Sequence, residues 1–205
     1  MIKSQHVAVT RGPGRRPGSP DTRAAILAAA RELFAAHGFA GTTIRAVGAQ
    51  AKVDPAMVHH YFGTKDDLFL AALELQIDPR EVMAPVIAGG PDGAGERLMR
   101  VFLSVWDDPE ARLPLIGVMR GIFDASGQRL VRDGFLRMVL GPVGAGLGID
   151  EPERRMPLVA SQLVGLVMIR YVLAVEPLAS LPAEQVVATY APTLQRYLTA
   201  PLPPT

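Results

Sequence analysis

The chain has 205 residues, 49% of them hydrophobic, and a formal net charge of +1, so it can bury a sizeable core as one domain or two small ones. The absence of cysteine excludes disulfides, thiol catalysis and cysteine-ligated metal sites. The N-terminus has no apolar targeting segment, and the longest apolar run, Leu163 to Ile169, is far shorter than a membrane span, so we expect a cytoplasmic protein with no membrane partner.

The first 18 residues form a basic arm rich in Gly, Pro and Arg. Lys3, Arg11, Arg15 and Arg16 lie in it without an acidic residue, and it shows no apolar periodicity. A segment that buries no apolar surface cannot offset the entropy of ordering, so we expect residues 1–18 to be disordered. Two roles remain open for the arm, a solvated tail or an insertion into an AT-rich minor groove.

Helical periodicity begins at Pro20. Apolar residues then recur at i, i+4, i+7 and i+8, namely Ile26, Ala30, Leu33 and Phe34. This pattern predicts an amphipathic helix with Gly38 as the left-handed residue just past its end.

Two short helices joined by a tight turn are predicted between Thr43 and Lys65. Thr43 is the N-cap of the first helix; Asp54 is the N-cap of the second and is followed by Pro55 at the first helical position. The face opposite the apolar pair of the second helix carries groups that can touch a base edge or a phosphate, which are Ala56, Met57, His59, His60 and Tyr61. The stretch predicts a helix-turn-helix reader of DNA.

A further helix is predicted after a capping box formed by Thr64 and Asp67, and it ends the first domain, residues 19–78. The remainder, residues 79–200, shows only helical segments. We expect a loop over residues 89–95, helices at 98–105, 110–125 and 128–140, and a break over 141–148 (GPVGAGLG).

The last two predicted helices differ from the others. Residues 158–175 are apolar on nearly every side, and residues 183–198 are their expected neighbour, bent or broken near Pro192. A helix that is apolar all round must be covered all round. The simplest cover is a second copy across a two-fold axis, so we expect a homodimer through residues 153–175 and 183–198.

The order of these parts resembles the tetracycline-repressor (TetR) family, on the motifs HGF, TTIRAVGAQAKV and DPAMVHHYFGTKDDLF. The resemblance covers residues 20–77 in detail. It implies an all-α fold with an N-terminal three-helix helix-turn-helix domain and a helical-bundle domain for ligand binding and dimerisation. It further implies a homodimeric regulator, usually a repressor, that binds a palindromic double-stranded DNA operator and is released by a small-molecule effector.

The resemblance also assigns contacts. Thr43 would meet a phosphate and Arg45 a base or the backbone; the major groove would receive Pro55, Ala56 and Met57, with His59 and His60 beside them. Tyr61 and Lys65 would contact phosphates of the DNA backbone. One residue departs from the family pattern, because Lys52 stands in the turn where glycine is usual. Either a lysine there adopts positive φ at a cost of about 1 kcal/mol, or the turn differs locally.

Other chemistry finds little support. Adjacent helical residues point about 100° apart and no carboxylate follows at i+4, so His59 and His60 predict no metal site. Residues 89–97 (GGPDGAGER) lack the lysine and hydroxyl ending of a phosphate loop. We therefore predict no catalytic residue and no cofactor.

An effector pocket is expected in the second domain, walled by apolar and convergent polar groups. The candidates, each more often a core residue, are Phe102, Trp106, Met119, Arg120, Phe123, Met168 and Tyr171. Arg120 and Arg170 lie in apolar helices and need partners, either an acidic ligand or Asp124 and Glu176. The alternative function is a helical small-molecule sensor or carrier whose head contacts protein rather than DNA; a helical-bundle enzyme is a third.

Overall fold

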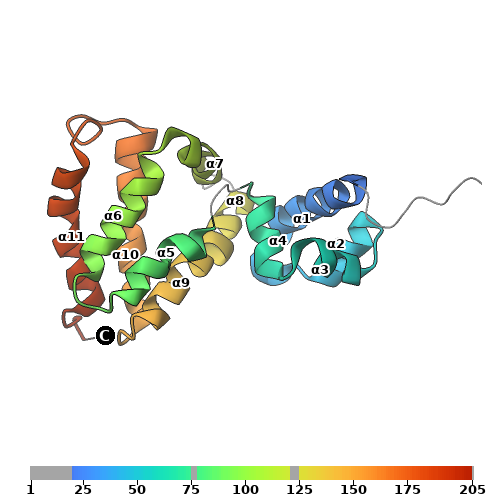
Figure 1. The fold of residues 1–205 in the computed structure, drawn as a ribbon, viewed down its shortest axis with the longest axis horizontal. Coiled ribbons are helices and arrows are strands. Elements are labelled where there is room, and N and C mark those ends of the chain that lie inside the picture. The colour runs from blue at the N-terminus through green and yellow to red at the C-terminus, as the bar shows by residue number, and fades with distance from the viewer. Residues whose placement is uncertain (1–19, 75–77, 121–124, 205) are drawn as a thin grey trace, which may run out of the picture.

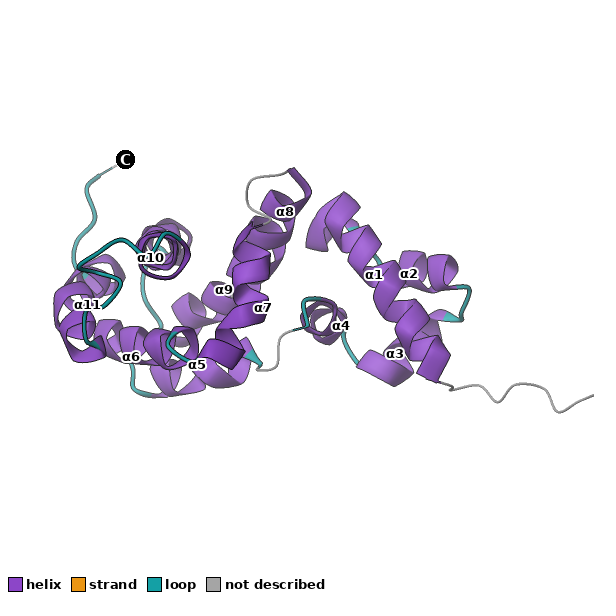
Figure 2. Ribbon diagram, turned by 90° about the horizontal axis from the view of Figure 1, so that it is seen from above, coloured by secondary structure: helices purple, strands orange, loops and turns teal. Residues whose placement is uncertain are grey.

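The computed structural model describes residues 20–74, 78–120 and 125–204, and these residues are helical with no strand among them. The predicted disordered arm, residues 1–18, lies outside the described residues. Two views at right angles show a small group of helices, α1 to α4, at one end of an elongated molecule and the remaining helices at the other (Figures 1 and 2). The predicted all-α fold is confirmed.

The head consists of α1 (Pro20–Gly41), α2 (Ile44–Ala51), α3 (Pro55–Phe62) and α4 (Lys65–Ala72). One hydrophobic cluster holds these helices together, with Ile26, Phe34, Val47, Val58, Phe62, Leu68 and Phe69 as its large buried members. The helix assignment of α1 runs past the predicted stop, but Gly38 interrupts it with a φ of 70°. This break turns Phe39 back toward the core, where its ring lies 6.0 Å from that of Phe34.

The predicted tight turn between α2 and α3 forms with its lysine in the left-handed conformation. Lys52 adopts φ 57° and ψ 42°, and its N–H donates to the carbonyl of Ala49. The left-handed region disfavours a residue with a Cβ. Gly48 is needed nearby for a different reason: a Cβ there would lie 3.0 Å from the carbonyl oxygen of Val53, so only glycine lets α3 approach α2 this closely.

The start of α4 is tied to the body by a carboxylate. Asp67 accepts hydrogen bonds from the backbone N–H (3.0 Å) and hydroxyl (2.6 Å) of Thr64, which completes the predicted capping box. Its other oxygen lies 2.6 Å from the guanidinium of Arg80 in α5. The Thr64 hydrogen bond is the largest of the effects that lower the pKa of this carboxyl. The head is therefore connected to α5 through an ionised group.

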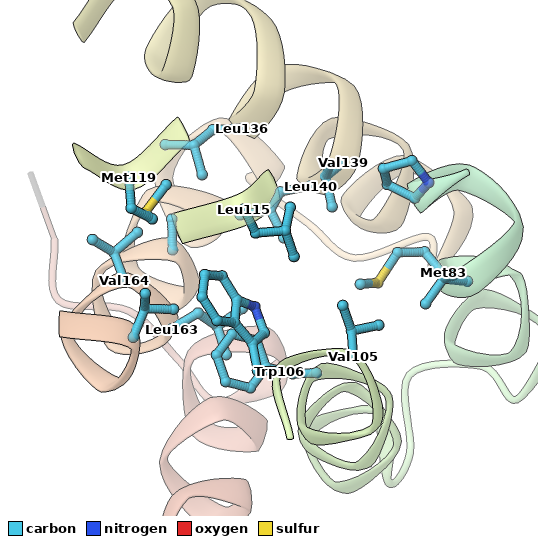
Figure 3. Close-up of a pocket in the computed structure, with 15 residues that line it drawn as sticks. Met83, Val105, Trp106, Leu115, Met119, Leu136, Val139, Leu140, Leu163 and Val164 are labelled. Atoms are coloured by element: carbon cyan, nitrogen blue, oxygen red, sulfur yellow. The ribbon is translucent and has the colours of Figure 1, made fainter. Parts of the chain in front are cut away.

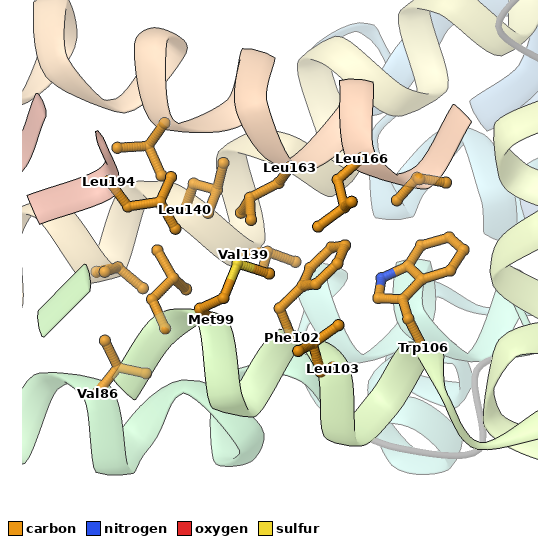
Figure 4. Close-up of a cluster of buried hydrophobic side chains, with 14 of the residues drawn as sticks. Val86, Met99, Phe102, Leu103, Trp106, Val139, Leu140, Leu163, Leu166 and Leu194 are labelled. Atoms are coloured by element: carbon orange, nitrogen blue, oxygen red, sulfur yellow. The ribbon is translucent and has the colours of Figure 1, made fainter. Parts of the chain in front are cut away.

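The body contains α5 (Pro79–Ala88), α6 (Ala94–Trp106), α7 (Pro109–Arg120), α8 (Ala125–Leu130), the π-helix η2 (Val131–Leu136), α9 (Arg137–Gly146), α10 (Pro152–Leu166), the π-helix η3 (Val167–Val172) and α11 (Ala183–Thr199). A second hydrophobic cluster fills its interior. Figure 4 shows that α6 and α10 contribute facing rows of side chains, including Met99, Phe102, Leu163 and Leu166.

One sequence prediction about the body is wrong, and one helix was not predicted. The expected break at 141–148 is largely helical, because α9 runs to Gly146. A Cβ at Gly144 would lie 3.0 Å from Met156, so this glycine permits close packing on α10. The helix that was not predicted is α5, which has a capping side chain: Asp78 accepts a hydrogen bond of 2.8 Å from the N–H of Arg80. Of the two alternatives for α11, bent or broken near Pro192, the structure excludes the break.

The helical stretch Pro152–Val172 has 21 residues and a mean hydropathy of 1.2, which by length and composition suffices to cross a membrane. The longest uninterrupted apolar run of the sequence, Leu163 to Ile169, underestimates the length of this apolar helix. The stretch nevertheless contains the buried guanidinium of Arg155, which donates hydrogen bonds of 2.8 Å to the carbonyls of Tyr197 and Ala200. An arginine so bonded to the end of α11 is typical of the core helix of a globular domain.

The turn supplies a stability prediction. Lys52→Gly removes a left-handed strain of about 1–2 kcal/mol and adds an unfolded-state entropy cost of about 0.5–1 kcal/mol. We expect a net gain of about 0.5–1 kcal/mol, which raises the Tm by about 2 °C for a chain of this size. Urea and thermal unfolding measure it. Lys52→Ala is the control, since it removes the charge but keeps the strain; equal stabilisation by both variants would contradict the strain argument.

Candidate functional site

The first candidate surface is formed by α2, the turn and α3. Thr43 caps α2 by accepting a hydrogen bond of 3.1 Å from the N–H of Ala46, and Asp54 caps α3 by accepting one of 2.7 Å from the N–H of Ala56. The side chains that leave this surface toward solvent are those of Thr43, Arg45, Ala56, His59 and His60, while Pro55, Met57, Tyr61 and Lys65 are half-buried. The predicted set thus lies on the two short helices and the cap residue Thr43, with Lys65 at the start of α4.

His59 is oriented by the end of its own helix. Its Nδ1 lies 2.7 Å from the carbonyl oxygen of Gly63. A carbonyl only accepts hydrogen bonds, so Nδ1 carries the proton and Nε2 of the neutral ring is left with a lone pair. The imidazole edge of His59 is therefore an acceptor when the ring is neutral.

Two predicted phosphate-contacting residues differ in their availability. The ammonium of Lys65 lies 4.3 Å from the ring centroid of Phe39, and partial burial lowers its pKa from the ordinary lysine value. The hydroxyl of Tyr61 is buried and has no hydrogen-bond partner among the described residues. The predicted phosphate contact of Tyr61 does not fit this side-chain position, because the ring would have to rotate outward to expose its oxygen.

No group of three or more His, Cys, Asp or Glu side chains that could hold a metal ion occurs in the described part of the chain. The adjacent His59 and His60 are both exposed, and the ring of His60 lies edge-on to that of Tyr61 at 5.5 Å.

The second candidate site is a pocket of about 90 Å³ inside the body (Figure 3). It lies between α5, α6, α7, α9 and α10, with the two π-helices at its edges. Its lining residues are Pro79, Val82, Met83, Phe102, Val105, Trp106, Leu115, Met119, Leu136, Val139, Leu140, Ala160, Leu163, Val164 and Val167.

Three of the predicted effector contacts line this pocket, namely Phe102, Trp106 and Met119. Met168 and Tyr171 are not among its lining residues. Phe123 and the side chain of Arg120 lie outside what the structure describes, as does Asp124.

Arg170 has its own partners within the protein. Its guanidinium donates hydrogen bonds of 2.6 Å and 2.8 Å to the carbonyls of Leu178 and Leu181 and lies 3.4 Å from the carboxylate of Asp107. Tyr171 donates a hydrogen bond of 2.8 Å to the same carboxylate, and burial raises the pKa of its hydroxyl. Of the partners suggested for Arg170, Glu176 is wrong, because its carboxylate instead accepts a hydrogen bond of 2.5 Å from the hydroxyl of Ser180.

Sequence reasoning missed the pocket walls from α5 and α9. Val82 and Met83 lie in a helix that was not predicted, yet Asp78 and Pro79 repeat the N-cap and first-position signal that identified α3. That signal was sufficient to find α5. Leu136, Val139 and Leu140 carried no comparable local signal.

A capped helix pair with a tight turn, carried on an all-helical body with an interior apolar pocket, defines the class of helix-turn-helix proteins with a separate helical domain. Residues 26–72 match the model for bacterial regulatory proteins of the tetR family, and residues 92–198 match the model for the tetracyclin repressor-like C-terminal domain. The chain belongs to the TetR family.

Individual curated relatives match part of the chain. The transcriptional repressor Rv3405c of Mycobacterium tuberculosis is 38% identical over 92 residues, which are 42% of this chain and 49% of the relative. The transcriptional repressor NicS of Pseudomonas putida is 41% identical over 66 residues, 32% of this chain and 31% of the relative. The chain thus spans about half or less of the curated relatives it matches. A solved TetR-family regulator from Streptomyces coelicolor is 40% identical over 91% of this chain and 99% of that one, with a TM-score of 0.47.

Proposed function

We propose that the protein is a homodimeric, ligand-responsive transcriptional regulator, acting as a repressor, that binds a palindromic operator in the cytoplasm. The observation that carries the proposal is the N-terminal end of α3, which Asp54 caps, where Ala56 is exposed and Pro55 and Met57 are half-buried, and which lies close to α2 at Gly48. A recognition helix presents its N-terminal residues to base edges in the major groove. Ala56 and Met57 hold those positions here.

The chemistry of this face favours a particular kind of readout. The exposed side of α3 has no Arg, Asn or Gln, the side chains that most often form bidentate contacts with guanine or adenine. Ala56 and Met57 offer apolar contacts suited to the methyl group of thymine, and His59 offers one acceptor. The remaining specificity comes from DNA shape, while Arg45 and Lys65 supply phosphate contacts that fix position.

The dimer contact is proposed on the outer face of α10 and η3. Leu158 and Ile169 are 36% and 37% exposed there, and Leu173 just beyond is 60% exposed. The exposed residues of α11 are by contrast mostly polar, and Glu184 forms an ion pair with Arg100 of α6. Within the two predicted dimer helices, α10 therefore supplies the apolar centre and α11 the polar edge. The partner that fits is a second copy, which must hold two recognition helices about 34–36 Å apart.

Effector control is proposed through the helix that walls the pocket. Leu136 of η2 lines the pocket, and Gly134 of the same π-helix contacts the ring of Phe69 in α4. A ligand that binds one position of η2 more tightly than another shifts the population of head orientations. Release from the operator follows when the favoured orientation no longer matches the spacing of the half-sites.

The direct test is a mobility-shift titration of the purified full-length protein with DNA from upstream of its own gene. We expect sequence-dependent binding whose affinity falls steeply between about 50 and 200 mM salt. Random-sequence DNA of equal length is the control. Absence of DNA binding at low salt with ligand binding intact would overturn the proposal and favour a sensor whose head contacts protein.

Two substitutions distinguish a residue that contacts the DNA phosphates from a residue that contacts a base. Lys65→Gln removes one phosphate contact, so all operators should weaken alike and the salt slope should fall by about 1. Met57→Ala should instead reduce discrimination at one base pair by about 1 kcal/mol and leave the salt slope unchanged. Fluorescence anisotropy on a panel of single-base operator variants measures both. A change in base preference with Lys65→Gln would contradict this assignment.

Charged substitutions at the proposed dimer surface test whether this surface joins two copies of the chain. In Leu158→Glu/Ile169→Glu, two carboxylates replace apolar groups at the proposed two-fold contact, and sedimentation should give a species of 21.9 kDa instead of twice that mass. Leu113→Glu is the matched control, because Leu113 is 69% exposed but lies on α7. Both positions of the double variant are accessible in the single chain, so the monomer should keep its helical circular dichroism. A folded double variant that stays dimeric would refute the surface.

A further inference from the structure

We infer that the pocket in the body takes an uncharged, largely apolar molecule of about the size of one aromatic ring. The inference rests on the proposed function only in that such a molecule would be the effector. The nature of the pocket walls, its size and the engagement of the nearby charged groups carry it.

The walls are made almost entirely of hydrocarbon. Every lining side chain is aliphatic, aromatic or a thioether, and the indole N–H of Trp106 is the single polar hydrogen that they provide. All of these side chains come from helices, in whose interiors the backbone groups are hydrogen-bonded within the helix. A buried ligand charge would find no partner among these lining groups, and an unpaired buried charge is strongly disfavoured.

The nearest charged groups are engaged elsewhere. Arg170 and Tyr171 follow the lining residue Val167 on η3, but both bond to Asp107 at the end of α6. Arg170 also bonds two backbone carbonyls, as described above, and is buried. The Nε of Arg170 is buried without a hydrogen-bond partner in the described part of the chain, but neither Arg170 nor Tyr171 is a lining residue of the pocket. An anion in the pocket therefore meets no cationic side chain among its lining residues.

Aromatic and flexible side chains set the size. The rings of Phe102 and Trp106 are stacked with centroids 5.8 Å apart, which offers a flat wall to an aromatic ligand. The pocket volume of about 90 Å³ is smaller than the cavity of about 150 Å³ that binds benzene in an engineered protein. Met83 and Met119 line the pocket, and such unbranched thioethers move easily to admit a ring.

The backbone of the walls is an independent indication of a ligand site. Each of the two π-helices in the described chain gives one residue to the lining, Leu136 from η2 and Val167 from η3. Such π-helical turns are rare and occur frequently at functional sites. Two π-helices beside one apolar pocket therefore indicate a binding site, because ordinary core packing does not require a π-helix.

The test uses Trp106, the single tryptophan of the chain, as a reporter inside the site. Toluene added to the full-length protein should change the tryptophan emission saturably and raise the Tm. Benzoate and benzylammonium have the same ring with one charge, and both should bind at least about 100-fold more weakly. Comparable binding of either charged probe, or no saturable response to toluene, would overturn the inference.

A pair of variants locates the response. Val105→Phe places a ring in the pocket and should abolish toluene binding, whereas Ser104→Phe adds the same ring to the exposed face of α6 and should leave it intact. Thermal unfolding reports whether each variant folds. Val105→Leu fills less of the pocket than Val105→Phe and serves as a second variant at the same position. Toluene binding unaffected by a folded Val105 variant would overturn the placement. No DNA is present in these measurements, so their outcome is independent of whether the head binds an operator.

Discussion

The head and the pocket side of the body meet at the ring of Phe69, which packs against Gly134. Phe69 is fully buried, and its ring lies edge-on to Phe34 at 5.0 Å and to Phe39 at 5.2 Å, so it belongs to the core of the head. A Cβ at position 134 would overlap the same ring, so the body must present glycine there. Leu136, two residues further along η2, lines the pocket. The head is therefore seated on the π-helix that walls the pocket, and this contact is the route that we propose for effector control.

The head was predictable because its determinants are local. Each helix cap accepts a hydrogen bond from a backbone N–H no more than three residues away, as seen for Thr43, Asp54 and the pair Thr64 and Asp67. Such caps can therefore be predicted from a few adjacent residues of the sequence. The family resemblance then placed the contact residues on this frame. It did not predict that the Tyr61 hydroxyl is buried, because that depends on how the ring packs on the rest of the head.

The body was harder to predict because its determinants are tertiary. The glycines of 141–148 suggest a break when read alone, but a Cβ at Gly144 would lie 3.0 Å from Met156 of α10, and a Cβ at Gly146 would lie 2.6 Å from Ile87 of α5. The π-helix η3 also changes the phase of the helix, since Leu173 bonds to Met168 across five residues instead of four. A period of 3.6 residues carried through this region places Met168 and Tyr171 on the pocket side, and the structure turns them away from it.

Two buried arginines fix α10 and η3 against the segment that contains α11. Arg155 binds the carbonyls at the end of α11, and Arg170 binds the carbonyls of Leu178 and Leu181 just before its start. Guanidinium groups suit this task because their planar array of donors satisfies several carbonyls at once. With α10 and η3 held at both ends by hydrogen bonds, the outer apolar face that we propose as the dimer contact is fixed relative to the segment that contains α11. In the proposed dimer, the spacing of the two heads therefore depends on these arginines as well as on the dimer contact itself.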